Sequence, residues 1–533
     1  MVITSFQFLG FILATLVVFR LVSERKQWIV LLIASVIFYL SFSIGGIFIM
    51  IATALLTYIV AIKVEKHKNE YAKWLEMNKK SVDRETRKAK KNYYQNKQKA
   101  LVVSAVVITV GVLFLCKYYS GFAIGVNGLL NTKIWTAENI LLPLGISYYS
   151  LQLIGYLVDV YRDIIPAEKN PLKVILYGAF FLSIMQGPFN RYSQLMPQIC
   201  VEKREKLTYP RIKHSILRIA GGYIKKMCIA DQVAVIANEV FTNYSDYSGL
   251  GILLGIVCFA IQLYADFSGY MDIIIGIGEL FDIQMPENFR QPFFSRNMSE
   301  FWQRWHITLG AWLKDYLFYP ILKSNVWKNM GKALTKKIGK EAGRRIPTYL
   351  GMIVLWTTIG AWHGAGLNYV FGVGVLQFIY IFFGEICLPI TEASKRKLRI
   401  NDGSLLWHIF QSLRCTVLMM FAWVFFNSSS FKQAIALLKR FLTTPSLSQM
   451  TAVIYSDGVS GEWINWLIYI VICIIVLIGI DLLHENNIFL RQIVNAKSYP
   501  VRLLFYLMLA FALIVLGAYG EQYNASNFIY FDF

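Results

Sequence analysis

LGILLGIVCFAIQLYADFSGYMDIIIGIGEL, residues 250–280, carries three charged side chains in 31 positions. A helix of this length and composition is long enough to cross a hydrocarbon core about 30 Å thick. Comparable apolar blocks recur along the chain, near residues 5–22, 28–44, 46–62, 100–118, 138–160, 172–188, 348–361, 366–388, 405–426, 463–483 and 501–519. This recurrence predicts an all-α polytopic membrane protein.

The composition of the 533 residues agrees with a membrane protein, since 56% are hydrophobic and 16% are charged. Soluble proteins average about 45–50% apolar and about 25% charged residues. The difference excludes a disordered chain, a collagen-like fibre and a typical cytosolic enzyme. Two segments, 212–240 and 300–320, mix polar and apolar residues and are predicted to be amphipathic or partly inserted helices.

The net charge of +21 is concentrated in three segments. Lys and Arg exceed Asp and Glu by 8 in residues 63–99, by 5 in 191–218 and by 7 in 323–346. Basic loops between apolar spans mark the cytosolic side of a membrane. The N-terminus and the C-terminal tail 520–533, which has no Lys or Arg, are therefore predicted to be extracytoplasmic. No loop is large enough to form a basic nucleic-acid domain, so the expected partner is the lipid bilayer and not nucleic acid.

Residues 63–99 combine high helical propensity with mixed charge, which predicts a solvated cytosolic helix pair. Attraction of this segment to anionic lipid, or to a phosphate-bearing donor, is the alternative.

The seven cysteines lie singly and without any CxxC pair, so neither a metal site nor a disulfide framework is predicted. Each cysteine is instead expected to be a small buried hydrophobe.

Two of the six histidines stand out, because each follows a tryptophan in an apolar neighbourhood. His363 lies in WTTIGAWHGAGLNYVFGVG, between two apolar stretches, where an ionisable group is costly and often functional. His306 lies in a segment interpreted as one helix from about Ser299 to Leu317. Its stripe of Trp302, His306, Leu309 and Leu313 is typical of an amphipathic interfacial helix. The alternative for each histidine is a neutral ring that is hydrogen-bonded to a neighbouring helix.

Several stretches together carry a resemblance to a known family. They read LPLGISYYSLQLIGYLVDVYR (142–162), QGPFNRYSQLMPQ (186–198), QLYADFSGYMDIIIGIGELF (262–281), PENFRQPFFSRNMSEFWQRWHITLGAWLKDYLFYP (286–320), GAWHGAGLNYVFGV (360–373) and FAWVFFNSS (421–429). The chain resembles the membrane-bound O-acyltransferase (MBOAT) family, in the bacterial branch of the alginate O-acetylation and teichoic-acid D-alanyl transfer proteins. The resemblance implies a ring of tilted transmembrane and re-entrant helices around a central funnel.

The resemblance also implies a division of the chain and of its catalytic roles. Residues 100–430 would form the catalytic core, between N-terminal spans with their basic loop (1–99) and C-terminal spans with an extracytoplasmic tail (431–533). His363 would be the main catalytic residue and His306 its partner. Transfer of an acyl group to a hydroxyl needs a base, and histidine suits that role near neutral pH. No metal is required.

The remaining candidate site residues are assigned by position and residue type. Asp266, Asp272 and Asp315 are expected to be structural counter-ions. The pocket and donor-binding candidates are Trp302, Trp305, Trp362, Asn288, Arg296 and Arg304, with the tryptophans expected to exclude water. Further basic candidates for the phosphates of the donor, on charge alone, are Arg290, Lys314 and the loop 323–346.

The C-terminal residues FIYFDF (528–533) resemble a terminal motif of this branch, or of its small partner peptide, in which the tyrosine is thought to accept the acyl group and pass it outward. On that reading Tyr530 is a third catalytic residue. A phenol has a pKa near 10, so its ester stays activated for onward transfer. The alternative is an aromatic tail anchored at the membrane interface.

The sequence therefore predicts a bacterial plasma-membrane O-acyltransferase. It would take an acyl group, expected to be acetyl from acetyl-CoA, from a cytosolic thioester donor for O-acylation of an extracytoplasmic polysaccharide or cell-wall polymer. A secreted SGNH-type transferase is the expected partner. The alternatives are D-alanyl-type transfer from an acyl carrier protein, and a non-catalytic transporter or flippase.

Overall fold

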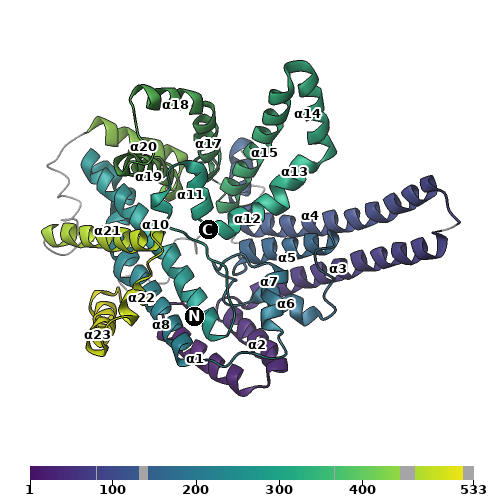
Figure 1. Cartoon of the computed structure of the whole chain (residues 1–533), viewed down its shortest axis with the longest axis horizontal. Helices are drawn as coiled ribbons and strands as arrows, with labels where there is room; N and C mark the ends of the chain where they lie inside the picture. Colours follow the sequence, from purple (N-terminus) through teal and green to yellow (C-terminus); the bar gives the residue numbers. More distant parts are fainter. Residues whose placement is uncertain (80, 131–141, 365, 445–462, 520–533) are drawn as a thin grey trace. The chain divides into compact units, whose positions relative to one another are not determined.

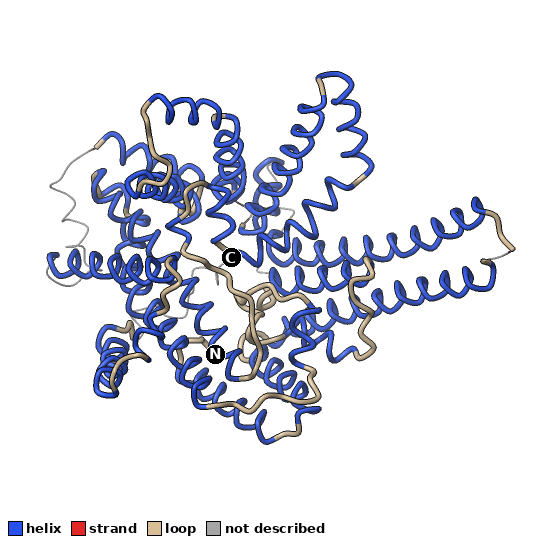
Figure 2. Tube along the Cα trace, in the orientation of Figure 1, coloured by secondary structure: helices blue, strands red, loops and turns tan. Residues whose placement is uncertain are grey.

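The computed structural model describes residues 1–79, 81–130, 142–364, 366–444 and 463–519. Within these ranges every regular element is a helix, apart from one isolated antiparallel bridge between Phe289 and Trp305 (Figures 1 and 2). The predicted all-α fold class is therefore confirmed.

The chain folds as two compact units. Unit 1 comprises Met1–Arg211 and Ile277–Pro286, and unit 2 comprises Ile212–Gly276 and Glu287–Phe533. The boundaries at 99/100 and 430/431 that the resemblance implies stay a prediction.

Unit 1 contains the N-terminal helices. They are α1 (Phe6–Leu21), α2 (Gln27–Leu40), α3 (Ile44–Asn78), α4 (Arg84–Leu130), α5 (Ile146–Tyr161), α6 (Pro171–Ala179) and α7 (Tyr192–Ile199). The predicted helix pair in residues 63–99 is confirmed, because α3 runs to Asn78 and α4 starts at Arg84. The two helices lie side by side in Figure 1.

The apolar block 172–188 is not a spanning helix. Asn170 caps α6 by accepting a hydrogen bond from the Leu172 N–H (3.0 Å), and the helix ends after nine residues at Ala179. Residues 180–190 continue as buried, non-helical chain. Asn190 holds this segment by donating to Ser183 Oγ (2.9 Å) and to the Pro188 carbonyl (3.0 Å). Irregular backbone of this kind is tolerated because protein surrounds it.

Unit 2 contains the helices that follow. They are α8 (Tyr209–Tyr223, which begins in unit 1), α9 (Asp231–Thr242), α10 (Gly249–Leu280), α11 (Met298–Arg304), α12 (Ile307–Leu313), α13 (Tyr319–Lys323), α14 (Asn325–Ile338), α15 (Lys340–His363), α16 (Leu367–Tyr369), α17 (Leu376–Ile386), α18 (Leu388–Lys397), α19 (Leu405–Asn427), α20 (Phe431–Thr443), α21 (Trp463–Glu485), α22 (Leu490–Asn495) and α23 (Tyr499–Leu516). Three π-helical segments, Ile224–Ala230, Lys314–Phe318 and Val370–Val375, join some of them.

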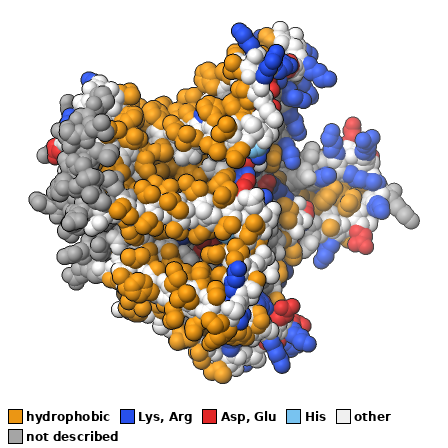
Figure 3. Space-filling model, turned by 60° about the vertical axis from the view of Figure 1, so that its left-hand side comes forward, with side chains coloured by type: hydrophobic (Ala, Val, Ile, Leu, Met, Phe, Trp, Pro, Cys, Tyr) orange, Lys and Arg blue, Asp and Glu red, His pale blue; other side chains and the backbone are white. Residues whose placement is uncertain are grey.

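Seven helical segments in the described ranges are long and apolar enough to cross a membrane. They are Ile44–Asn78, Arg84–Tyr119, Gly249–Leu280, Leu367–Ile386, Leu405–Asn427, Ile468–Glu485 and Tyr499–Leu516. The five other expected spans, 5–22, 28–44, 138–160, 172–188 and 348–361, do not reach that length and hydropathy; α2, for example, has 14 residues. Residues 138–141 of these lie outside the described residues. Apolar side chains cover much of the face in Figure 3, as expected for a surface in contact with lipid. The molecule is a multi-pass membrane protein.

A buried ionic cluster holds α10 against the π-helical segment Ile224–Ala230 in unit 2. A Cβ on Gly269 would lie 2.8 Å from the Gly222 carbonyl oxygen, so only glycine allows the two backbones to approach this closely. Close to this crossing, Lys226 Nζ lies 2.6 Å from Asp266 Oδ1 and 2.8 Å from Asp231 Oδ1. Lys226 and Asp266 are each 1% exposed. The prediction that Asp266 is a counter-ion is therefore confirmed.

Asp272 also has cationic partners, because it forms ion pairs with Arg218 (3.2 Å) and Lys225 (2.8 Å).

The cysteines were predicted to be buried, and the structure agrees with this only in part. Cys228, Cys258, Cys415 and Cys473 are buried, whereas Cys387 is exposed next to the start of α18. The expectation of burial is wrong for that residue.

Candidate functional site

His306 lies at a break between two short helices. After α11, Trp305 has an extended backbone, and α12 begins directly after His306. His306 has φ 48° and ψ 48°, the left-handed conformation that residues other than glycine adopt rarely. The prediction of one helix from Ser299 to Leu317 is therefore wrong. The loop 287–291 pairs with the backbone here, through the Phe289–Trp305 bridge and the Arg290 N–H, which donates to the Arg304 carbonyl (2.9 Å).

Asn288 in this loop contacts His306 and the first two residues of α12. Its backbone carbonyl accepts a hydrogen bond from the Ile307 N–H (3.0 Å). Its side-chain Oδ1 lies 2.9 Å from Thr308 Oγ1, 3.1 Å from the Thr308 backbone nitrogen and 3.3 Å from His306 Nδ1. The Asn288 side chain is completely buried. The sequence assigned Asn288 to the site, and the structure places it against His306.

His363 is the last residue of α15 and is 4% exposed. Its ring lies between Trp362, with ring centroids 4.9 Å apart, and Phe426, at 5.6 Å. Gly364, which follows, lies so close to Tyr369 that a Cβ would stand 2.4 Å from its ring. Only glycine fits at position 364 without displacing the Tyr369 ring.

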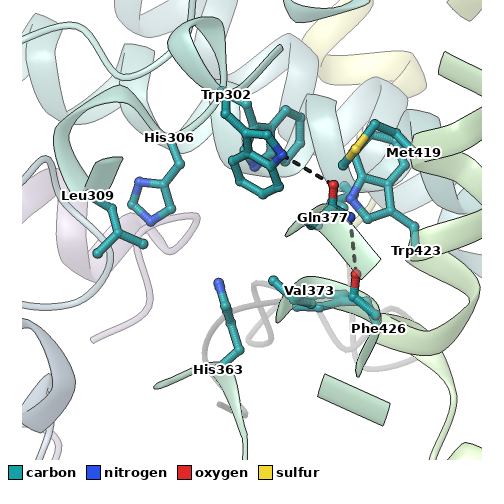
Figure 4. Close-up of a pocket in the computed structure, with 12 residues that line it drawn as sticks. Trp302, His306, Leu309, His363, Val373, Gln377, Met419, Trp423 and Phe426 are labelled. Carbon is teal, nitrogen blue, oxygen red and sulfur yellow. Dashed lines mark hydrogen bonds between the residues drawn. The ribbon is translucent and has the colours of Figure 1, made fainter. Parts of the chain in front are cut away.

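One pocket in unit 2 is lined by both histidines. About 390 Å³ of space in it is free of protein atoms, and part of that space is open to solvent. The lining residues are Leu263, Trp302, Trp305, His306, Leu309, His363, Gly372, Val373, Gln377, Met419, Trp423 and Phe426. Figure 4 shows the imidazoles of His306 and His363 directed into the space between them. Two residues far apart in sequence thus meet in one pocket.

Aromatic rings form much of the pocket wall, and hydrogen bonds hold one of them in place. Trp305 stacks on Phe301, with ring centroids 5.6 Å apart and planes inclined by 17°. Trp302 Nε1 donates to Gln377 Oε1 (3.2 Å), as Figure 4 shows, while Gln377 Nε2 donates to the Gly372 carbonyl (3.0 Å). Trp302 and Trp305 line the pocket as predicted. Trp362 is not among the lining residues, but its ring lies next to both histidines, with its centroid 4.9 Å from that of His363 and 6.4 Å from that of His306.

The two arginines predicted to bind the donor do not line this pocket. Arg304 forms a bidentate pair with Glu485 (2.6 and 2.9 Å) and a second pair with Glu300 (2.7 Å). These carboxylates keep the pKa of Arg304 above its usual value. The Arg296 backbone accepts a hydrogen bond from Arg414 (2.9 Å). Donor binding by Arg296 and Arg304 stays a prediction, as does the role of Tyr530, which lies outside the described residues.

Some lining residues had no place among the sequence candidates. Gln377 is the clearest case, because it is 1% exposed and bonds across the pocket wall. Its signal was available, since it is an isolated amide in the apolar run VFGVGVLQFIYIFF. Trp423 and Phe426 also line the pocket. They lie in the stretch FAWVFFNSS, which contributed to the family resemblance, but neither was among the candidate site residues.

The site is electrostatically neutral. No acidic, Lys or Arg side chain is among the residues that line the pocket. Burial lowers the pKa of the His306 imidazole to about 3, because the charged form would lose its hydration. His306 is therefore neutral at physiological pH. Across the part of the chain that the structure describes, no three His, Cys, Asp or Glu side chains are grouped to hold a metal ion.

Comparison with known proteins associates this site with one family. The sequence model described as MBOAT, membrane-bound O-acyltransferase family, matches residues 37–335, which include His306 and Asn288. A probable alginate O-acetylase AlgI from Pseudomonas syringae pv. tomato is 27% identical over 415 residues, 77% of this chain and 69% of that protein.

Two further relatives differ in the group or the polymer that their names state. A peptidoglycan O-acetyltransferase from Helicobacter pylori is 27% identical over 444 residues, covering 78% of this chain and 73% of its own length. A teichoic acid D-alanyltransferase from Bacillus subtilis is 29% identical over 256 residues, 46% of this chain and 60% of that protein.

Proposed function

Because this chain belongs to the membrane-bound O-acyltransferase family, we propose that the pocket between His306 and His363 transfers an acyl group from a thioester to a hydroxyl. The chain is thus an O-acyltransferase with many membrane-embedded helices. The observation that carries the proposed site is the convergence of two buried histidines on one aromatic pocket.

The chemistry assigns His363 as the general base. The imidazole takes the proton of the acceptor hydroxyl while the oxygen of that hydroxyl bonds to the thioester carbonyl carbon. The carbon–sulfur bond then breaks, and the imidazolium returns the proton to the leaving thiolate. Proton transfer by a positioned side chain contributes typically about 10²–10⁴-fold to the rate. His306 orients the donor or the base from the opposite side of the pocket.

The aromatic wall supports this assignment, because water would hydrolyse the thioester. Trp302, Trp305 and Trp423 line the same pocket as the histidines, and Gln377 locks the Trp302 indole in place. An apolar wall limits the access of competing water and strengthens polar interactions within the pocket.

The lining residues favour an uncharged acyl group such as acetyl over D-alanyl. A D-alanyl group carries an α-ammonium, and burying such a charge without a partner is costly. No carboxylate is among the lining residues. We therefore place acetyl first, with acetyl-CoA as the donor, and keep D-alanyl transfer from an acyl carrier protein as the alternative. The relatives named for acetylation of alginate or peptidoglycan fit the first choice.

The proposed acceptor is an extracytoplasmic polysaccharide or cell-wall polymer. Relatives are named for alginate, peptidoglycan and teichoic acid, which are polymers of these classes. Transfer to them requires the acyl group to cross the bacterial plasma membrane. In the proposed orientation the two termini are extracytoplasmic and the basic loops are cytosolic. A secreted SGNH-type partner would complete the transfer outside.

The experiment that tests the proposal follows thiol release and acyl label together. Purified protein in nanodiscs is given acetyl-CoA with a radiolabelled acetyl group and a model hydroxyl acceptor. We expect release of CoA thiol in step with labelled ester. Absence of turnover with acetyl-CoA and with a D-alanyl carrier protein would contradict the enzyme assignment for this site and favour a transporter or flippase.

Tyr530→Phe tests whether the tail carries the acyl group. We expect this variant to lose polymer acylation and label on the protein, because a phenyl ring has no oxygen to form the ester. The measurement is radiolabel on the purified protein and on the polymer from cells. Tyr519→Phe is the matched control, since Tyr519 lies at the same end of the chain and donates a hydrogen bond to the Leu513 carbonyl. Normal polymer acylation in Tyr530→Phe would exclude the carrier role.

A further inference from the structure

The orientation of the Asn288 side chain is determined by its neighbours. A backbone N–H can only donate a hydrogen bond, and the Thr308 N–H lies 3.1 Å from Asn288 Oδ1. If the Asn288 amide were rotated so that its oxygen and nitrogen changed places, its NH₂ group would face the Thr308 N–H, and both groups are donors. Thr308 Oγ1, 2.9 Å from the same atom, also donates to it. The oxygen of Asn288 therefore faces His306, and its nitrogen faces Met271 Sδ at 3.6 Å.

This orientation determines which nitrogen of His306 carries the proton. Nδ1 lies 3.3 Å from Asn288 Oδ1, an atom that only accepts hydrogen bonds. The contact is favourable when Nδ1 bears hydrogen and repulsive when both atoms present lone pairs. A neutral imidazole has one protonated nitrogen, so Nε2 then carries the lone pair.

We propose that Asn288 is a positioning residue that holds His306 as the Nδ1–H tautomer, so that Nε2 presents a hydrogen-bond acceptor to the pocket. This inference rests on the proposed function for its kinetic consequence, but not for the tautomer itself. In this state His306 cannot donate a hydrogen bond to the carbonyl oxygen of a thioester through Nε2. It instead accepts one from the acceptor hydroxyl or from an N–H of His363.

The backbone around His306 supports a positioning role. A left-handed conformation at a residue other than glycine is strained and persists only where the surroundings impose it. Asn288 supports it through two contacts directly after His306: its carbonyl accepts from the Ile307 N–H and its side-chain oxygen accepts from the Thr308 N–H. The ring is further fixed edge-on to Phe267, with centroids 4.9 Å apart and planes at 89°.

The tautomer can be measured without any substrate. The chain has six histidines, so ¹⁵N-histidine labelling gives few signals in solid-state NMR spectra of protein in lipid. We expect the His306 ring, assigned by its loss in His306→Gln, to show a protonated Nδ1 and an unprotonated Nε2. A protonated Nε2 in the wild-type protein would overturn the inference.

Two substitutions of Asn288 connect the tautomer to the reaction. Asn288→Leu removes the acceptor, and we expect a mixed tautomer signal with kcat reduced by less than the about 10²–10⁴-fold of a positioned acid–base residue itself, and little change in KM. Asn288→Asp keeps an oxygen against Nδ1, so it should retain the tautomer and restore kcat to within a few-fold of wild type. Wild-type kcat in Asn288→Leu, or equal loss in Asn288→Asp and Asn288→Leu with both folded, would overturn the positioning role.

Asn190→Leu is the matched control for lost stability. Asn190 is a buried asparagine in unit 1 with two hydrogen bonds of its own, and it makes no contact with a histidine among those described. We expect lower thermal stability with unchanged His306 signals and kcat. If the tautomer is as inferred but wild-type protein turns over no acyl thioester, the proposed function fails and the inference about Asn288 stands.

Discussion

Replacement of His363 by alanine is expected to reduce acyl transfer about 10²–10⁴-fold, the usual contribution of a positioned acid–base residue. The loss should fall on kcat and leave KM for the donor nearly unchanged, because the histidine acts on the proton that moves in the transition state. The measurement is the rate of labelled ester formation from acetyl-CoA by purified protein in nanodiscs. His363→Gln, which keeps polarity and approximate size, should show the same loss.

A histidine outside the pocket provides the matched control. His408 lies in α19, and its Nε2 is 2.8 Å from the exposed Asp402 carbonyl. His408→Ala should retain activity within about two-fold and have an unchanged thermal midpoint. The double variant His306→Ala with His363→Ala should be little slower than the slower single variant, since residues that serve one step are not additive. Activity within ten-fold of wild type in folded His363→Ala would contradict the role of His363.

Removal of the Lys226 ammonium is expected to destabilise unit 2 more than any change at its surface. Lys226→Met leaves Asp266 and Asp231 as buried carboxylates without their cation. Breaking a buried ion pair in this way costs about 3–5 kcal/mol. Burial alone would lower the pKa of Lys226, but the two carboxylates keep it above its usual value, so the side chain is charged in the folded protein. The free energy of unfolding is measured by SDS titration in mixed micelles.

One further variant at this cluster and one control variant at the surface test whether the uncompensated buried charge causes the loss of stability. Adding Asp266→Asn to Lys226→Met removes one uncompensated carboxylate and should recover part of the lost stability. Arg345→Met is the control at the surface, because the Arg345–Glu341 pair is largely exposed and pairs of this kind contribute about 0–1 kcal/mol. If Lys226→Met is no less stable than Arg345→Met, the cluster does not hold α10 in place.

Much of the helical structure could be predicted from local sequence. Apolar length is a local property, and seven of the expected spans are helices of membrane-crossing length. The failures have a common cause. The block 172–188 was expected to span because it is apolar, yet it is buried as coil after α6. Hydropathy reports the absence of water and does not distinguish lipid from surrounding protein.

The site shows the same division between local and long-range information. The paired Trp-His motifs identified His306 and His363, because an ionisable residue in an apolar stretch is a local signal. The periodicity around His306 predicted one continuous helix, and the break came from the Phe289–Trp305 bridge. Arg304 was a candidate for the donor on charge alone, whereas its partner Glu485 lies in α21, 181 positions along the chain.

The sequence by itself determined the membrane class, the family and the two histidines, because these depend on composition, span length and short motifs. Only the tertiary structure decided that both imidazoles share one pocket, that Gln377 locks its wall and that Asn288 faces Nδ1 of His306. Those features depend on distances between residues far apart in the chain. Such distances are determined when helices pack, and no local pattern of residues specifies them.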